Sequence, residues 1–168
     1  MALTSGRVIH EAIFDEMIAI LRADTTLQER DANWDSEDVP HVIPGVQAVD
    51  PRLGGERNVE RMPFCEIGLG LVNTSKSGTY YVIDLHFTIR TWLVHGTDTD
   101  TLARAKAMAG FQWDIWEAFN AYWLINGQEE VLEHYPANLA PRLVSGDAWS
   151  VGEMDYIVRA GMSLITPS

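Results

Sequence analysis

The chain has 168 residues, a length that fits one domain with a core large enough to fold without disulfides. Its composition is 46% hydrophobic and 21% charged, and no apolar run approaches the roughly 20 residues that a membrane-spanning helix needs, so we expect a soluble protein with no membrane partner. Acidic residues outnumber basic residues 24 to 12, and the resulting net charge of −12 argues against a sequence-specific nucleic-acid partner, because phosphates are repelled.

The first predicted element is an amphipathic helix from Val8 to Leu21. Apolar residues recur there three and four positions apart, and acidic residues occupy the positions between them. Thr4 or Ser5 can cap the start of this helix. The cluster Asp24-Thr25-Thr26 predicts its end, with one further turn through Leu27.

Residues 28–62 are predicted to form an irregular extended arm within a single domain, 1–168. Charged and turn-forming residues dominate this segment, and several residues interrupt any long regular element (Pro40, Pro44, Pro51, Gly54 and Gly55). His41–Ile43 and Val46–Val49 are candidate short strands. Irregular segments of this length in a compact domain are often functional, and we expect the arm to become ordered against a neighbouring subunit.

A β-hairpin follows, with predicted strands from Pro63 to Val72 and from Thr79 to Leu93, and a loop at Asn73–Gly78. Along the second strand, mainly apolar and largely polar side chains alternate strictly. One face carries mainly apolar side chains (Tyr81, Ile83, Leu85, Phe87, Ile89, Thr91 and Leu93). The other is largely polar (Tyr80, Asp84, His86, Thr88, Arg90 and Trp92). This pattern indicates an antiparallel sheet that helices cover on one side.

A second helix is predicted to start after Thr97–Asp100 and to end near Tyr122. After a loop marked by turn residues (Asn126, Gly127, Pro136 and Pro141), a final hairpin is expected at Arg142–Ser145, near Trp149, and along the alternating run Asp155–Ile165. The fold class is therefore α+β. We predict a mostly antiparallel sheet with two amphipathic helices on one face, in the order helix, arm, hairpin, helix, hairpin.

The sequence contains no enzyme motif, and we predict no catalytic residues, no metal site and no cofactor. Asp31–Asp38 begins like a calcium loop, but Ser36 replaces the turn glycine and Val42 replaces the bidentate glutamate. The single cysteine, Cys65, excludes an internal disulfide and is expected to be a packed thiol. The five histidines have no metal-ligand spacing (His10, His41, His86, His95 and His134).

Three of the six tryptophans are expected at less buried positions: Trp34 on the arm, Trp92 on the polar strand face and Trp149 near the last hairpin. Large aromatic side chains at such positions favour a protein interface, with local packing as the alternative. Together with Tyr80 and Arg90, these three tryptophans are the candidate subunit-contact residues.

The order of elements resembles the tail terminator, or tail completion, proteins of long-tailed bacteriophages. The resemblance covers nearly the whole chain. It rests first on an acid-x-x-Leu turn after the first helix, Asp24-Thr25-Thr26-Leu27, and on a Pro-Phe strand, Pro63-Phe64-Cys65-Glu66-Ile67. It continues with a long aromatic-rich strand that ends in Arg90-Thr91-Trp92, an Ala-rich helix and a final hairpin. It implies a structural virion protein without enzymatic activity. Such proteins form a homo-oligomeric ring, usually a hexamer, that caps the tail tube and later joins it to the head.

The resemblance also implies the partners and the location of the protein. The partners are other copies of the chain, the tail tube protein and a head-completion or connector protein, and DNA passes through the ring. The protein is expected in the tail or neck of the virion, after assembly in the host cytoplasm.

Two alternatives remain open. The length of the arm also suits a neck or head-completion protein of the same particle. A small-ligand binding module or hydrolase would instead use the cleft between helix and sheet, with Asp84, His86 and Arg90 lining it. A cleft lined by these side chains, with shifted pKa values, would favour the binding module, whereas an open flat surface would oppose it.

Overall fold

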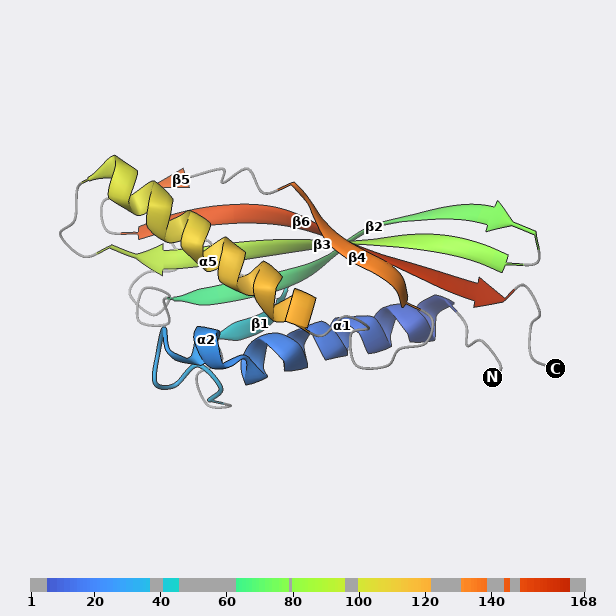
Figure 1. Ribbon diagram of the computed structural model, residues 1–168, viewed down its shortest axis with the longest axis horizontal. Coiled ribbons are helices and arrows are strands. Elements are labelled where there is room, and N and C mark those ends of the chain that lie inside the picture. Colours follow the sequence, from blue (N-terminus) through green and yellow to red (C-terminus); the bar gives the residue numbers. More distant parts are fainter. Residues whose placement is uncertain are drawn as a thin grey trace.

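The computed structural model describes residues 6–36, 41–45, 63–78, 80–95, 100–121, 131–138, 144–145 and 149–163. The helices are α1 (Gly6–Ala23), α2 (Thr25–Gln28) and α5 (Thr101–Ala121), and the strands are β1 (Val42–Gly45), β2 (Phe64–Ser77), β3 (Tyr80–Val94), β4 (Val131–Asn138), β5 (Val144–Ser145) and β6 (Trp149–Ser163). The strands form one six-stranded sheet in the order β1-β2-β3-β6-β4, with β5 paired to β6 (Figure 1). Among the described strand pairs only β1–β2 is parallel, so this mostly antiparallel sheet fits the predicted α+β class.

The core lies on one face of β3 and β6, which we call the inner face. β3 pairs with β6 along its whole length, from Tyr80 opposite Ser163 to Val94 opposite Trp149. The apolar alternation predicted for β3 is confirmed, because its inward residues are buried beside buried partners on β6 (Ile83, Leu85, Phe87 and Ile89 beside Ala160, Val158, Tyr156 and Met154). Side chains of α1 and α5 belong to the same core cluster.

Both predicted helices are present, and aspartates cap the starts of α2 and α5. Asp24 caps α2, the predicted further turn, because its Oδ1 accepts a hydrogen bond from the Leu27 N–H at 2.9 Å. Asp100 Oδ1 likewise accepts from the Leu102 N–H at 2.9 Å at the start of α5. The predicted caps at positions 4 and 5 lie outside the described residues.

The β2–β3 hairpin corrects the predicted loop. Asn73–Ser77, predicted as a loop, continues β2 and pairs with β3 as far as Tyr80. The turn contains Gly78, whose φ of 63° is a left-handed conformation that glycine adopts without a Cβ clash.

The register of this pair shifts between Leu69 and Val72, as in a β-bulge. A Cβ on Gly70 would lie 2.8 Å from the carbonyl oxygen of His86, so the close approach of the two backbones requires glycine there. The bulge marks the point at which β2 passes from the body of the sheet into the hairpin.

The C-terminal part of the sheet contains a strand that was not predicted. β4 includes Pro136, which was taken to mark a loop, and pairs with β6 at the end of the strand order. An edge strand tolerates proline, because one side of its backbone has no ladder partner to lose. β6 is one continuous strand of 15 residues where two separate runs were predicted, and its predicted inward residues Tyr156, Val158 and Ala160 are buried.

The predicted arm is described at residues 28–36 and 41–45. The first part folds back on the core: the indole Nε1 of Trp34 donates to the Leu21 carbonyl at 2.8 Å, and its ring contacts Phe111 edge-on. Trp34 is fully buried, so its expected exposure was wrong. The candidate strand His41–Ile43 is confirmed in part, since β1 contains Val42 and Ile43 but starts after His41, whereas Val46–Val49 lies outside the described residues.

Candidate interaction surface

The outer face of the sheet is the side opposite the core cluster, where the alternate residues of β3 point. Two rows of ion pairs cross it. Arg159 of β6 donates from Nε to Asp84 Oδ1 at 2.8 Å and from Nη1 to Glu133 Oε1 at 2.5 Å. Arg90 of β3 lies 3.2 Å from Glu153 and 3.9 Å from Glu66. In each row, one guanidinium lies between two carboxylates on neighbouring strands.

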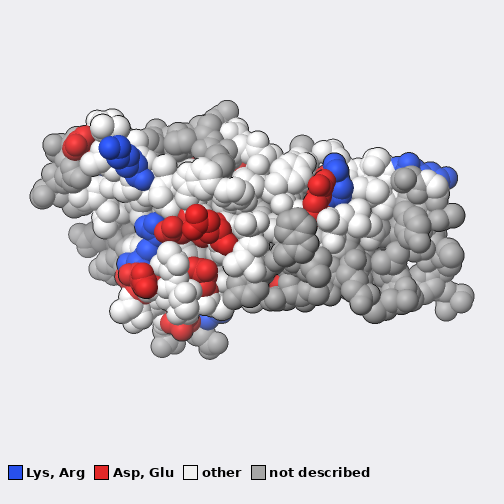
Figure 2. Space-filling view, in the orientation of Figure 1, with Lys and Arg blue, Asp and Glu red and all other residues white. Residues whose placement is uncertain are grey.

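The outer face carries more acidic than basic side chains in the part of the sheet that the structure describes. It has five carboxylates and two guanidiniums (Glu66, Asp84, Glu133, Glu153 and Asp155, with Arg90 and Arg159). In the view with α5 in front, Figure 2 shows acidic and basic groups mixed among uncharged areas. The excess of acidic groups on the outer face resembles that of the whole chain.

Asp84, His86 and Arg90 share one face of β3, as predicted, but they do not line a helix–sheet cleft. Asp84 is engaged by Arg159, and the hydrogen bonds from this guanidinium hold the pKa of the Asp84 carboxyl below its ordinary value. His86 Nε2 lies 3.2 Å from Asn73 Nδ2. All three residues lie on the face of β3 opposite the core, so they do not meet in the space between the helices and the sheet.

An aromatic cluster occupies one end of the outer face. The Trp92 ring stacks on Phe64 with ring centroids 5.5 Å apart, and it lies tilted against Trp149 with centroids 6.0 Å apart. Only 4% of Trp92 is exposed, so its predicted less buried position was wrong, and Trp149 is half-buried. The aromatic pattern on the strand therefore reflects packing within the protomer.

The five candidate contact residues do not form one patch. Trp34 lies in the core and Trp92 in the aromatic cluster, so neither indole offers a free surface. Arg90 is exposed, and Trp149 keeps part of its surface. Tyr80 begins β3, where its backbone pairs with Ser77 and Ser163, and its side chain lies outside the described part of the chain.

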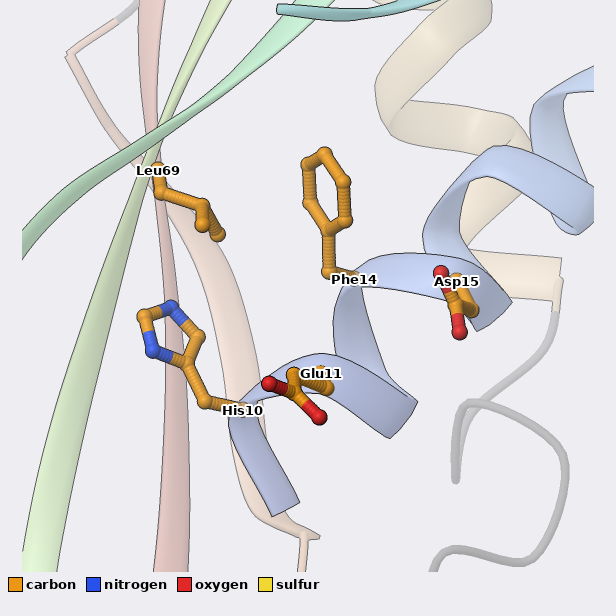
Figure 3. Close-up of a pocket in the computed structure, with 5 residues that line it drawn as sticks. All are labelled: His10, Glu11, Phe14, Asp15 and Leu69. Atoms are coloured by element: carbon orange, nitrogen blue, oxygen red, sulfur yellow. The ribbon is translucent and has the colours of Figure 1, made fainter. Parts of the chain in front are cut away.

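A pocket of about 470 Å³ lies between α1 and β2, lined by His10, Glu11, Phe14, Asp15 and Leu69 (Figure 3). We call it the α1–β2 pocket. The rings of His10 and Phe14 pack against Phe87 of the core, with centroids 5.6 and 6.4 Å away. Burial lowers the pKa of His10, and its buried Nε2 has no hydrogen-bond partner among the described residues. No sequence motif predicts this pocket, and His10 was expected at the helix positions between the apolar residues.

Cys65 is free and buried in β2, as predicted, and burial raises the pKa of its thiol. Among the residues with described positions, no group of three or more His, Cys, Asp or Glu side chains is placed to hold a metal ion. None of the described helices is long and apolar enough to cross a membrane.

Comparison with known proteins assigns no family to this chain. No protein-family model matches the chain, and no curated protein matches it in sequence. Function must therefore be inferred from the outer face, the strand edges and the α1–β2 pocket themselves.

Proposed function

We propose that this protein is a structural virion protein, a tail terminator whose copies form a ring that caps the tail tube and joins it to the head. Two amphipathic helices would cover the inner face of the sheet and leave the outer face and the strand edges for other subunits. The observation that carries the proposal is the order of elements, in which each stretch of the resemblance has its expected structural role.

The individual stretches support the proposal in the following way. The acid-x-x-Leu turn after α1 is a capped helical turn, with Asp24 bonded to the Leu27 N–H. The Pro-Phe stretch starts β2, and Arg90-Thr91-Trp92 lies near the end of the central strand β3. The Ala-rich segment is α5, and the sheet is completed by the C-terminal strands.

The charge of the outer face also suits a ring through which DNA moves. Its arginines are engaged by carboxylates, and acidic groups outnumber them. A surface of this kind repels phosphates and gives DNA few cationic groups to hold.

The two alternatives receive less support. The length of the predicted arm suggested the neck or head-completion role. Its first part, residues 28–36, instead packs on α5 of the same protomer, where Arg30 pairs with Asp114. The binding module required Asp84, His86 and Arg90 in a helix–sheet cleft, and these side chains lie on the outer face.

Sedimentation velocity tests the proposal on the purified protein, alone and with purified tail tubes. We expect closed rings in solution or co-sedimentation with the tubes, since some terminators assemble only on the tube. A chain that stays monomeric alone and does not sediment with tubes would count against the proposal.

A further inference from the structure

The outer edge of β2 lacks a strand partner over most of its length in the part of the sheet that the structure describes. β1 pairs only with Cys65–Gly68, whereas β2 continues from Leu69 to Ser77. Leu69 and Val72 are 53% and 44% exposed, and the residues from Asn73 to Lys76 are exposed as well. In Figure 1 this part of the hairpin extends beyond α5. Free N–H and C=O groups on such an edge can pair with an added strand.

The α1–β2 pocket lies where this free edge begins, because Leu69 belongs to both. Figure 3 shows His10, Phe14 and Leu69 around a common space, with Glu11 and Asp15 on the adjoining surface of α1. The pocket therefore combines two apolar walls, two exposed carboxylates and a buried ring nitrogen. A side chain on a strand added along β2 would lie next to this pocket.

The residues that line the α1–β2 pocket determine which kind of side chain it can bind. An aliphatic stem can cover Phe14 and Leu69, and a cationic end is attracted by Glu11 and Asp15. The His10 ring adds to the apolar wall, because its Nε2 is buried and burial lowers the pKa of the ring and favours its neutral form. An anionic side chain would be repelled by the same carboxylates, and a wholly apolar one would gain no attraction from them.

We propose that an extended segment of another protein chain adds to the β2 edge beyond Gly68 and places one lysine or arginine side chain in the α1–β2 pocket. The main-chain ladder supplies affinity, and the pocket supplies selectivity for the basic side chain. The site involves only α1 and β2 of one protomer, so peptide binding to it can be measured whether or not the protein forms a ring.

The test is an NMR titration of the full chain with the peptide acetyl-Thr-Val-Thr-Lys-Thr-Val-Thr-amide. We expect shifts of the backbone amides from Leu69 to Ser77 together with shifts of the His10 ring carbons. A matched peptide with norleucine in place of lysine keeps the stem and removes the charge. Two carboxylate contacts should make the lysine peptide bind about 2- to 30-fold more tightly than the norleucine peptide.

Two double variants test whether the carboxylates of the pocket cause the preference for the lysine peptide. Glu11→Gln combined with Asp15→Asn should remove the preference for lysine, because both carboxylates of the pocket lose their charge. Glu29→Gln combined with Glu117→Gln is the control, because it neutralises two exposed acids outside the pocket and should keep the preference.

Four results would each overturn the proposal. The first is equal affinity for the lysine and norleucine peptides, and the second is absence of binding to the lysine peptide. The third is a set of amide shifts along β2 without any shift at His10. The fourth is equal affinity for free butylamine and the lysine peptide, which would make the site a small-amine pocket. Ring formation is measured separately, by sedimentation, so failure of this site and failure of the proposed ring can be distinguished.

Discussion

Arg159 and Asp84 form the best-defined ion pair of the outer face. Two guanidinium nitrogens of Arg159 hydrogen-bond to the two carboxylate oxygens of Asp84, at 2.8 and 3.3 Å. These bonds lower the pKa of Asp84 in the folded state. The linked stabilisation is therefore fully present above the unfolded-state pKa of about 3.9 and is lost as the pH falls through the lower folded-state pKa. Both side chains are partly exposed, so solvent screening keeps this contribution small.

Replacing Arg159 should remove the cause of the lowered pKa of Asp84. In Arg159→Gln the pKa of Asp84 should rise towards its ordinary value, because the charged donor is lost, and NMR titration of the Asp84 carboxyl carbon measures the change. Arg22→Gln is the control, since Arg22 donates to the Asp35 carbonyl and does not contact Asp84. An unchanged pKa of Asp84 in the Arg159 variant would disprove the assignment of the shift to this pair.

Helices and the central strand were predictable from the sequence, because their apolar periodicity matches the face that each one buries. α1 and β3 both follow their predicted pattern. Asn73–Ser77 was misread because a polar hairpin end that is exposed on both faces has the composition of a loop, and its pairing with β3 outweighs local propensity. β4 was missed because Pro136 is read as a breaker unless the edge position of the strand is known.

Contacts between distant elements explain the other differences. Trp34 follows an acidic stretch that looks solvated, yet the turns after α2 bring its ring between α1, β1 and α5. The α1–β2 pocket was equally hidden, because four of its residues lie on α1 and Leu69 lies on a strand far along the chain. Local patterns carry no information on such packing.

The burial of Trp34 predicts that residues 28–36 contribute to stability. Trp34→Ala should lower the free energy of unfolding by about 3–5 kcal/mol, because it leaves a large cavity and an unpaired Leu21 carbonyl. Urea denaturation followed by circular dichroism measures this loss.

Trp113→Ala provides the matched control, since Trp113 is 46% exposed on α5 and contacts Trp116. Its cost should be about 1 kcal/mol or less. If the two variants lost equal stability, Trp34 would not have the packing role described above.

The whole molecule combines a net charge of −12 with a long sheet that has exposed residues along β2 and β4. Excess negative charge opposes nonspecific association, so any assembly must depend on specific contacts at the strand edges or the outer face. A ring around a DNA passage would use this charge to keep DNA from binding to its wall.

Electron microscopy of tail tubes assembled in the presence of this protein tests the central claim most directly. The tail terminator account predicts tubes of restricted length, each with a ring of this protein at one end. Tubes with bare ends and an unchanged distribution of lengths would contradict the account.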